Sequence, residues 1–304
     1  MEQSLRLIIN PAARSGRARG LLLPILPSLL ARGWRVDAAE SRSHQDLIDL
    51  VHEAVNRGCH TAVAIGGGDG SATAAAQALR GQVVPLGILP LGTGNDFARG
   101  LGMPLDPRIA ARALVPGRTR TIDLGEVTAL TTGETRTFAC VAGIGLDVFA
   151  LEAIARVPWL TGRLKYTYGG LRGLLSYEPQ HVRVTVDGQE FSDEVMFVAI
   201  TNTPTYGGGM RINPGALMDD GTLDVCIVRR TSRPRLISRY PLVYAGRHVG
   251  LPEVWQARGG RVEIASGRPM RVCIDGEITS LTTPIRVEIV PRGLVVLTPS
   301  PGDP

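Results

Sequence analysis

Two glycine-rich segments within residues 61–99 limit the folds that this chain can adopt. Residues 61–65 (TAVAI) and 86–89 (LGIL) have the apolar pattern of buried strands, and each runs directly into a loop, GGGDGS at 66–71 and PLGTGNDFAR at 90–99. Apolar strands that alternate with helices are typical of a parallel sheet. Ligands of such sheets bind outside the carboxyl ends of the strands, so the two loops are predicted to share a binding site.

The residue types in these loops indicate a polyphosphate ligand with magnesium. Glycines let backbone N–H groups approach phosphate oxygens, and the positive end of the following helix favours phosphate. No lysine follows the first loop, which excludes a Walker A loop, and Asp69 would put a carboxylate into the pyrophosphate space of a dinucleotide site. An aspartate beside phosphates is explained if it holds or positions a metal. The simpler alternative is a strand-to-helix turn that binds nothing.

Strands and helices alternate through the rest of the N-terminal part. Residues 5–9 read as a strand, and a third strand-end loop with Gly, Ser and Arg follows it at 10–16. Residues 34–39 read as a second strand and residues 44–57 as an amphipathic helix. Right-handed crossovers would bring all three loops to one edge of the sheet. From residue 118 onward, short strands dominate, with helical patterns mainly at 146–176 and 233–248. These strands are expected at 119–126, 135–141, 181–186, 194–200, 223–228, 261–264, 270–274 and 285–290.

The change in pattern predicts two domains. The first is an α/β domain at residues 1–123, to which residues 292–304 could return, and the second is a β-sandwich-like domain at residues 124–291. The chain has 304 residues, which is long for a single core.

Composition narrows the choice of partner and compartment. The excess of Lys and Arg over Asp and Glu, 33 − 28 = 5, fits an anionic nucleotide or acidic lipid, and no feature indicates nucleic acid. Four scattered cysteines without a C-x-x-C pair predict reduced thiols in a cytoplasmic protein. The longest uncharged apolar stretch, 21–31, contains two prolines and is shorter than the ~20 residues of a spanning helix. Contact with a membrane is therefore expected to be peripheral and transient.

The two glycine-rich loops together resemble the catalytic domain of diacylglycerol kinases, a family that includes sphingosine, ceramide and soluble bacterial lipid kinases. Ser71 stands where the family usually has Thr and keeps the hydroxyl. The resemblance implies a Rossmann-like N-terminal domain of the NAD kinase and diacylglycerol kinase type and a β-sandwich-like C-terminal domain for the lipid. Further motifs in the family's order lie at residues 10–16, 141–147, 207–212, 219–225 and 274–277.

The resemblance implies ATP and Mg²⁺ as cofactors and assigns roles to the loops. Asp69, Asp96 and Asp123 look like the family's acidic cluster, which handles magnesium; a strand-end cap is the alternative for Asp123. The residues expected at the nucleotide are Asn10, Pro11, Ala12, Ala13, Arg14, Ser15, Gly16, Gly66, Gly67, Gly68, Asp69, Gly70, Ser71, Thr93, Gly94 and Asn95.

Two acidic turns in the second half have both a structural and a functional interpretation. Asp275-Gly276 and Asp187-Gly188 both read as hairpin turns. The family's D-G-E motif implies that Asp275, supported or replaced by Glu277, takes the proton from the lipid hydroxyl, whereas Asp187 stays a turn. The segment 217–222 is either an acidic turn or, by resemblance, a structural magnesium site. Its ligands would be the Asp220 carboxylate and the carbonyls of Leu217 and Thr222.

Residues 158–177 predict a helix with an apolar face flanked by cations. Leu160, Leu164, Tyr168, Leu171 and Leu175 share that face, and Arg163, Lys165 and Arg172 flank it. Such a helix either contacts anionic headgroups or packs on the second domain, and its glycines favour packing.

The sequence thus predicts a lipid kinase that uses ATP and magnesium, with diacylglycerol as the preferred substrate and phosphatidic acid as the product. The lipid hydroxyl is expected to enter a cleft between the domains. The alternatives are an NAD kinase, which carries a related G-G-D-G loop, and a non-catalytic nucleotide or lipid sensor. The sequence leaves the lipid and the oligomeric state open; a homodimer is compatible with it.

Overall fold

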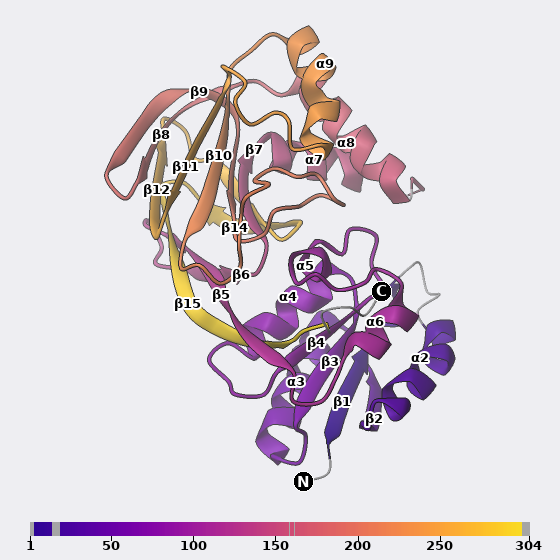
Figure 1. Ribbon diagram of the computed structural model, residues 1–304. Coiled ribbons are helices and arrows are strands. Elements are labelled where there is room, and N and C mark those ends of the chain that lie inside the picture. Colours follow the sequence, from indigo (N-terminus) through magenta and orange to yellow (C-terminus); the bar gives the residue numbers. More distant parts are fainter. Residues whose placement is uncertain (1–2, 14–18, 158, 161, 300–304) are drawn as a thin grey trace. The chain divides into compact units, whose positions relative to one another are not determined.

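The chain forms two compact units, which Figure 1 shows with the elements labelled. Unit 1 consists of residues 1–123 and 291–304, and unit 2 of residues 124–290. The computed structural model describes residues 3–13, 19–157, 159–160 and 162–299. The chain passes between the units within the strands β5 (Thr119–Ala129) and β15 (Ile285–Leu297).

Unit 1 is a parallel sheet with helices on its faces. The strands run in the order β2–β1–β3–β4, and β15 adds to β4 in parallel through Val296 and Leu86. Helix α2 packs with α6, and α3 packs with α4. The elements are β1 (Ser4–Ile9), α2 (Arg19–Ala31), β2 (Arg35–Glu40), α3 (His44–Arg57), β3 (Ala62–Gly67), α4 (Asp69–Ala78), β4 (Leu86–Pro90), α5 (Asp96–Gly100) and α6 (Pro107–Ala113).

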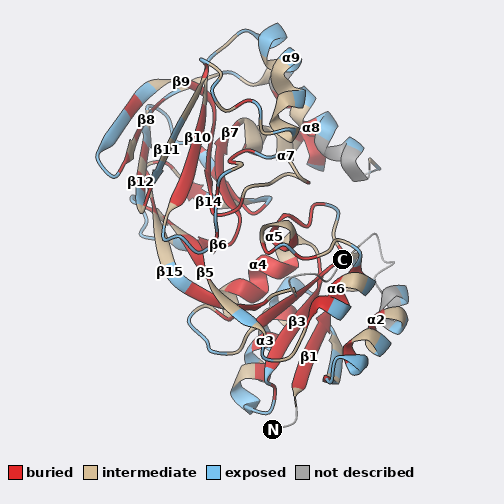
Figure 2. Cartoon of the chain, in the orientation of Figure 1, coloured by how far each residue is buried: buried red, intermediate tan, exposed pale blue. Residues whose placement is uncertain are grey.

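Burial follows the position of each strand in this sheet. Every residue of β1, β3 and β4 is buried, whereas most residues of the edge strand β2 are exposed (Figure 2). The α3 helix shows how local sequence sets an element's ends. The Ser43 hydroxyl accepts a hydrogen bond from Asp46 N at the start, and Gly58 ends the helix in the left-handed region with φ +62°. Leu47, Val51 and Ala54 form its buried face.

Unit 2 is a β-sandwich-like domain of antiparallel strands, and its described residues also form three helices. Strand β9 is central, because it pairs with β7, β8 and β10. The elements, besides parts of β5 and β15, are β6 (Thr135–Phe138), β7 (Val141–Gly145), α7 (Leu146–Ala155), α8 (Gly162–Ser176), β8 (Gln180–Val186), β9 (Gln189–Thr201), β10 (Leu223–Arg229), α9 (Arg233–Tyr244), β11 (Val254–Gly259), β12 (Arg261–Ser266), β13 (Arg271–Ile274) and β14 (Glu277–Thr282).

Valine, isoleucine and leucine side chains from these strands make one apolar core, including Val184, Ile200, Val225 and Ile264. Burying branched apolar side chains is the main favourable term for a domain of this kind. All four cysteines are free.

Helix α8 packs on α7 through Gly169 and Gly173 and leaves Leu164, Leu171 and Leu175 exposed. A Cβ on Gly169 would collide with the backbone O of Ala150 and the side chain of Ile154, and one on Gly173 would meet Leu146, so both glycines permit close approach to α7. On the other side of α8, Leu164 is 69% exposed and Leu175 is 45% exposed. The side chains of Arg163 and Lys165, which were predicted to flank this face, lie outside the described residues.

The secondary structure differs from the expectations in two places, at the strand predicted at 135–141 and at two strands that were missed. The single strand predicted at 135–141 is two strands, β6 and β7, because the chain turns at Ala139 and Cys140. The helical pattern at 146–176 is confirmed and consists of two helices, α7 and α8. Strands β11 and β14 were missed because neither has a strong apolar pattern; most residues of each are half-exposed or exposed.

Candidate active site

The loops after β1 and β3 are joined by hydrogen bonds. Asn10 N donates to the carbonyl of Gly66 at 2.9 Å, and the Asn10 side-chain amide donates to the Ser71 hydroxyl, also at 2.9 Å. The Asn10 Oδ1 in turn accepts from Ala12 N at 3.0 Å, which fixes the start of its own loop. Asn10 therefore positions both its own loop and the first turn of α4. Arg14, Ser15 and Gly16 lie outside the described residues.

The loops after β3 and β4 meet backbone to backbone. Leu91 N donates to Gly67 O at 2.8 Å. A Cβ on Gly68 would lie 3.1 Å from the Cα of Gly92, and a Cβ on Gly92 would collide with that of Gly68. These two glycines are thus required by close approach, because neither has a positive φ.

The first turn of α4 has the geometry of an anion site. Gly68 is its N-cap, and glycine has no side chain that could cap the first N–H groups of α4. Beside it, Asn95 adopts φ +56° and bonds Gly92 through both side-chain atoms, with Oδ1 accepting at 2.8 Å and Nδ2 donating at 3.0 Å. Thr93, in the tight loop that Asn95 closes, is exposed.

The three predicted acidic residues of unit 1 each have an assigned structural contact. Asp69 Oδ1 accepts from Phe97 N at 3.0 Å, and Asp123 Oδ1 accepts from Arg292 N at 2.7 Å. Asp96 is buried, with Arg99 Nε 3.7 Å from its Oδ1. Within the described parts of the chain, no three His, Cys, Asp or Glu side chains form a metal-binding group. A magnesium ion here would take one or two carboxylates and complete its shell with phosphate oxygens and water.

In unit 2, the Asp275 carboxylate is held by three consecutive backbone amides. Its Oδ2 accepts from Ala139 N at 2.8 Å, and its Oδ1 accepts from Cys140 N at 2.9 Å and Val141 N at 2.7 Å. Asp275 is buried and has φ +46°, as the first residue of the tight turn between β13 and β14. These bonds explain the break between β6 and β7, since the amides at 139–141 point to a carboxylate instead of a neighbouring strand.

The Asp187 carboxylate likewise accepts hydrogen bonds from consecutive backbone amides, at the turn between β8 and β9. It has φ +44°, and its carboxylate accepts from Gly260 N at 2.7 Å and Arg261 N at 3.0 Å. Glu277 is exposed, and it differs from both aspartates because its carboxylate is in no hydrogen bond or ion pair among the described residues. Of the two acids in the 275–277 motif, only Glu277 thus has a carboxylate that is open to a ligand.

The carboxylates of the acidic turn at 217–224 form ion pairs with Arg258. Arg258 contacts Asp220 Oδ2 at 2.5 Å and Asp224 Oδ1 at 3.0 Å, and Thr222 donates to Asp220 Oδ1 from both its backbone N and its hydroxyl. Carboxylate and carbonyl oxygens suit a hard cation, so the donors fit magnesium in kind. The guanidinium of Arg258, however, already neutralises the carboxylate that would bind the metal.

Sequence reasoning gave no role to Asp147, at the start of α7. Its Oδ1 accepts from the Tyr206 hydroxyl at 3.0 Å, and its Oδ2 is buried without a partner among the described residues. Burial raises the pKa of Asp147 to about 7, and burial together with Asp147 raises the pKa of Tyr206 well above its usual value. The only indication of Asp147 in the sequence was that it is a charged residue within the otherwise apolar motif at 141–147.

Comparison with known proteins identifies the family. Residues 4–127 match the model of the diacylglycerol kinase catalytic domain, and residues 140–298 match that of the YegS C-terminal NAD kinase beta sandwich-like domain. A diacylglycerol kinase of Mycobacterium tuberculosis is 34% identical over 297 residues, which cover 97% of this chain and 95% of that protein. The chain belongs to the diacylglycerol kinase family.

Further relatives of this lipid kinase agree. A protein named "Probable lipid kinase YegS-like" from Pseudomonas fluorescens is 34% identical over 250 residues, 81% of this chain and 80% of that protein. The crystal structure of a diacylglycerol kinase from Bacillus anthracis has the same fold, with a TM-score of 0.76 over 100% of this chain and 98% of that one, at 23% identity. The predicted family, the predicted fold class and the predicted enzyme class, a lipid kinase, are confirmed.

Proposed function

We propose that this lipid kinase transfers the γ-phosphoryl group of ATP, in the presence of Mg²⁺, to the hydroxyl of a lipid, with diacylglycerol as the preferred acceptor. The observation that carries the proposal is the joining of three strand-end loops in unit 1. Hydrogen bonds from Asn10 to Gly66 and Ser71, from Leu91 to Gly67 and from Phe97 to Asp69 tie them into one group of amides, hydroxyls and carboxylates. Phosphoryl transfer depends mainly on such positioning and on charge neutralisation.

The proposed nucleotide site consists of these loops. Amides at 66–71 and the first turn of α4 would bind phosphate oxygens, with the hydroxyls of Ser71 and Thr93 beside them. A magnesium ion held with the nucleotide would neutralise phosphate charge, and Asp69, Asp96 and Asp123 are the proposed carboxylates that position it or its water.

Glu277 is the proposed general base, and Asp275 is the residue that positions it. A base needs a carboxylate that can reach the acceptor hydroxyl. The hydrogen bonds from three backbone amides to the Asp275 carboxylate favour a role in which Asp275 fixes the β13–β14 turn. Glu277, which begins β14 two residues later, has the exposed carboxylate. This reverses the preference for Asp275 that the sequence suggested.

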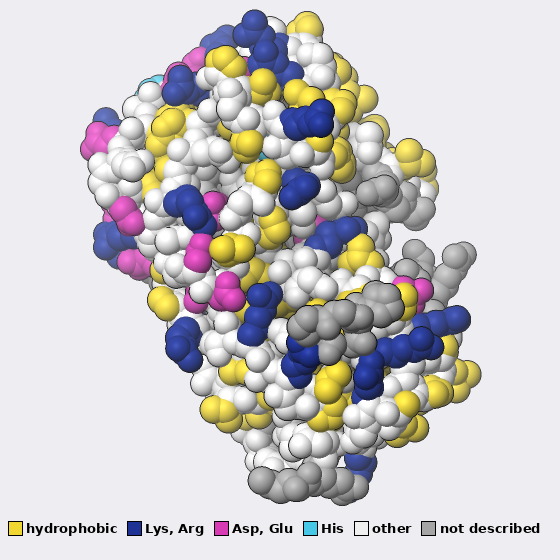
Figure 3. Space-filling model, viewed as in Figure 1, with side chains coloured by type: hydrophobic (Ala, Val, Ile, Leu, Met, Phe, Trp, Pro, Cys, Tyr) yellow, Lys and Arg dark blue, Asp and Glu magenta, His cyan; other side chains and the backbone are white. Residues whose placement is uncertain are grey.

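The lipid is proposed to reach the enzyme from a membrane surface. No helix among the described residues is long and apolar enough to cross a bilayer. The exposed leucines of α8, with the arginines of α8 and α9, support peripheral binding: residues 157–177 and 229–248 contain nine Lys and Arg and no Asp or Glu. Figure 3 shows hydrophobic side chains and basic side chains over α8 and α9.

The structural magnesium site at the acidic turn is a further part of the proposal. Asp220 and the carbonyls of Leu217 and Thr222 would hold the ion, and Arg258 would have to leave Asp220 Oδ2. The positive charge of Arg258 would compete with Mg²⁺ for Asp220 and so lower the affinity of this site for the metal.

The test is a phosphorylation screen with labelled ATP, with and without Mg²⁺. Diacylglycerol, phosphatidylglycerol, a sphingoid base and NAD are the acceptors. Label in phosphatidic acid, dependent on Mg²⁺, is the expected result. Label only in NADP would establish an NAD kinase instead, and turnover of no acceptor, with ATP still bound, would establish a sensor.

A further inference from the structure

A cysteine, a histidine and an aspartate form a chain of contacts in unit 1 that the proposed kinase reaction does not use. Cys59 Sγ lies 3.5 Å from His60 Nδ1, and His60 Nε2 lies 3.1 Å from Asp37 Oδ2. Cys59 and His60 lie between α3 and β3, and Asp37 lies in β2. A nucleophilic side chain is activated by such an arrangement, in which a base contacts it and a third group orients the base.

Asp37 fixes the histidine ring. It is the register partner of Arg6 in the β1–β2 pair, and Arg6 Nη1 donates to the same Asp37 Oδ2 at 2.5 Å. Burial acts to raise the pKa of Asp37, but the hydrogen bonds and positive charges of Arg6 and His60 outweigh it and hold this pKa below its usual value. An ionised carboxylate only accepts hydrogen bonds, so His60 Nε2 carries a proton. In the neutral ring, Nδ1 therefore presents its lone pair to Cys59.

The other charges around this cluster come from β1 and α3. Arg6 is buried, and its Nη2 lies 3.6 Å from Glu53 Oε2. The other oxygen of Glu53 pairs with Arg57 Nη2 at 2.6 Å. Two arginines and two carboxylates, those of Asp37 and Glu53, thus balance in charge. Activation of the Cys59 thiol accordingly depends on the ring nitrogen of His60 and not on a net positive charge around the sulfur.

Cys59 also differs from the other cysteines in its access to solvent. All four cysteines lie within the described residues, and only Cys59 is exposed. Burial raises the pKa of Cys226 to about 12 and that of Cys273 well above its usual value. A buried thiol of this kind is inert, because the thiolate is the nucleophile. A reagent in solution should therefore distinguish Cys59 from Cys140, Cys226 and Cys273.

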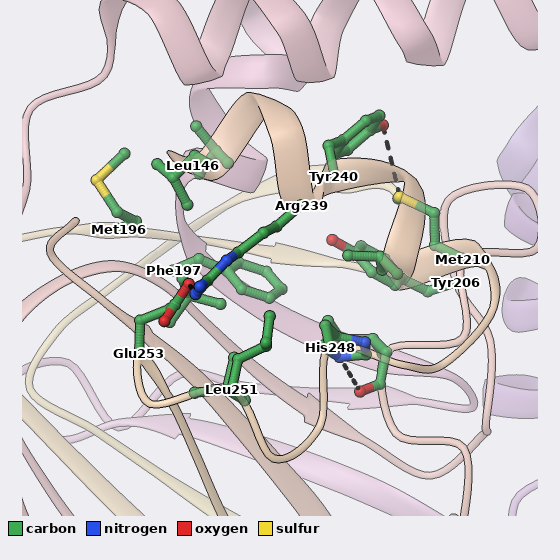
Figure 4. A pocket seen from close by; sticks show the side chains of 15 residues that line it. Leu146, Met196, Phe197, Tyr206, Met210, Arg239, Tyr240, His248, Leu251 and Glu253 are labelled. Atoms are coloured by element: carbon green, nitrogen blue, oxygen red, sulfur yellow. Dashed lines mark hydrogen bonds and ion pairs between the residues drawn. The ribbon is translucent and has the colours of Figure 1, made fainter. Parts of the chain in front are cut away.

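Another contact between a cysteine and a histidine, Cys226–His248, lacks these properties. His248 lines a cavity beneath α9 (Figure 4), and its Nε2 lies 2.9 Å from Ile212 O and 4.0 Å from Cys226 Sγ. Because a carbonyl oxygen only accepts hydrogen bonds, this Nε2 carries a proton and cannot take one from Cys226. At Cys59 the ring nitrogen that faces the sulfur is the one that can accept a proton.

We propose that Cys59 is a modification site that forms a mixed disulfide with a low-molecular-weight disulfide, and that His60, positioned by Asp37, accepts its proton. The Cys59 thiol gives its proton to His60 Nδ1, and the thiolate attacks one sulfur of the small disulfide. The bond between the two sulfurs of that molecule breaks as the bond to Cys59 Sγ forms. The leaving sulfur takes the proton from His60 Nδ1, so Cys59 is oxidised and the leaving half is reduced to a thiol. This chemistry is independent of the proposed kinase function.

The test uses the full chain and dithiodipyridine, an uncharged disulfide whose released thiopyridone is followed by its absorbance. At pH ~7 the folded wild type should react at Cys59, as mapped by mass spectrometry, and Cys59→Ser should not react. His60→Gln should slow the reaction about tenfold, because the proton acceptor is lost. A rate in His60→Gln equal to that of wild type would overturn the proposal, and so would an adduct on a buried cysteine in place of Cys59.

A second pH separates proton transfer from access to the sulfur. At pH ~10 hydroxide ionises an ordinary thiol, so the rates of wild type and His60→Gln should converge. A deficit that persists there would mean that the substitution only blocks access, and would overturn the role of His60. His52→Gln, at an exposed histidine of α3, is the matched control and should react like wild type at both pH values. Asp37→Asn acts on the same ring from its other nitrogen and should also slow the reaction at pH ~7. It decides the proposal if His60→Gln does not fold.

Discussion

The Asp69 carboxylate accepts a hydrogen bond from the backbone N–H of Phe97, with 3.0 Å between Oδ1 and the nitrogen. Asp69 opens α4, and Phe97 lies in the first turn of α5, so one carboxylate ties together two loops that follow neighbouring strands. The same side chain is proposed to position magnesium, so its two roles need separation.

Asp69→Asn should separate these roles. Asparagine keeps an oxygen that can accept from Phe97 N but removes the negative charge, so the Tm should stay within a few degrees while kcat falls roughly 10²-fold. The control is Asp106→Asn, because Asp106 caps α6 in the same unit and Asn caps equally well. Unchanged kcat in D69N would exclude a role for the charge.

Gly92→Ala should loosen the nucleotide site. The new Cβ would collide with Gly68 Cα, which forces the two loops apart. A cost of about 1–3 kcal/mol in stability and a loss of ATP affinity are expected. The control is Gly20→Ala in α2, because a Cβ at Gly20 would have no neighbouring atom within 4 Å. Calorimetry of ATP binding and thermal unfolding measure both effects, and ATP affinity equal to wild type would contradict the proposed site.

Glu277→Gln and Asp275→Asn should have different effects. Glu277→Gln should lower kcat by roughly 10²–10⁴ without changing the Tm, because the side chain is exposed and the base is lost. Asp275→Asn should lower the Tm as well, because asparagine cannot satisfy all three amides at 139–141. Asp187→Asn, at the comparable exposed turn, should leave kcat unchanged. Full activity in Glu277→Gln would return the role of base to Asp275.

Arg258→Gln should reveal metal binding at the acidic turn. Removing the guanidinium leaves Asp220 and Asp224 without their cation, so Mg²⁺ should bind more tightly and raise the Tm of the variant more than that of wild type. Differential scanning fluorimetry across a MgCl₂ series measures this. Equal shifts in both proteins, or a shift that persists in Asp220→Asn, would place the metal elsewhere.

The stability of the protein should depend on pH through Asp147. Burial raises the pKa of this carboxyl to about 7 in the folded state, above the 3.8 of an ordinary aspartate. The folded state thus binds the extra proton, so the stabilisation is complete below pH ~4 and is lost as the pH rises to ~7. Between pH 5 and 8 the Tm of wild type should therefore fall relative to that of Asp147→Asn. Parallel Tm profiles would show that this carboxyl does not titrate differently on folding.

The exposed face of α8 should govern binding to vesicles. Leu171→Glu with Leu175→Glu should weaken binding to phosphatidylglycerol vesicles at least tenfold, because it removes apolar contact and adds negative charge. Leu130→Glu, at another exposed leucine of unit 2, is the control. Sedimentation with vesicles measures binding. Loss of binding in all variants alike would point to general charge rather than to this helix.

The amino-acid sequence by itself determined the family, the parallel α/β unit, the β-rich unit and the loops that carry the candidate nucleotide site. Those features are local: strand patterns, glycines and turn residues act over a few neighbouring positions. Only the tertiary structure decided what Asp275 does, because Asp275 and Asp187 share one turn sequence, and their amide partners at 139–141 and 260–261 lie far away in the chain. The cavity beneath α9 and the buried Asp147–Tyr206 pair depend on the same kind of long-range packing, which an apolar pattern alone does not record.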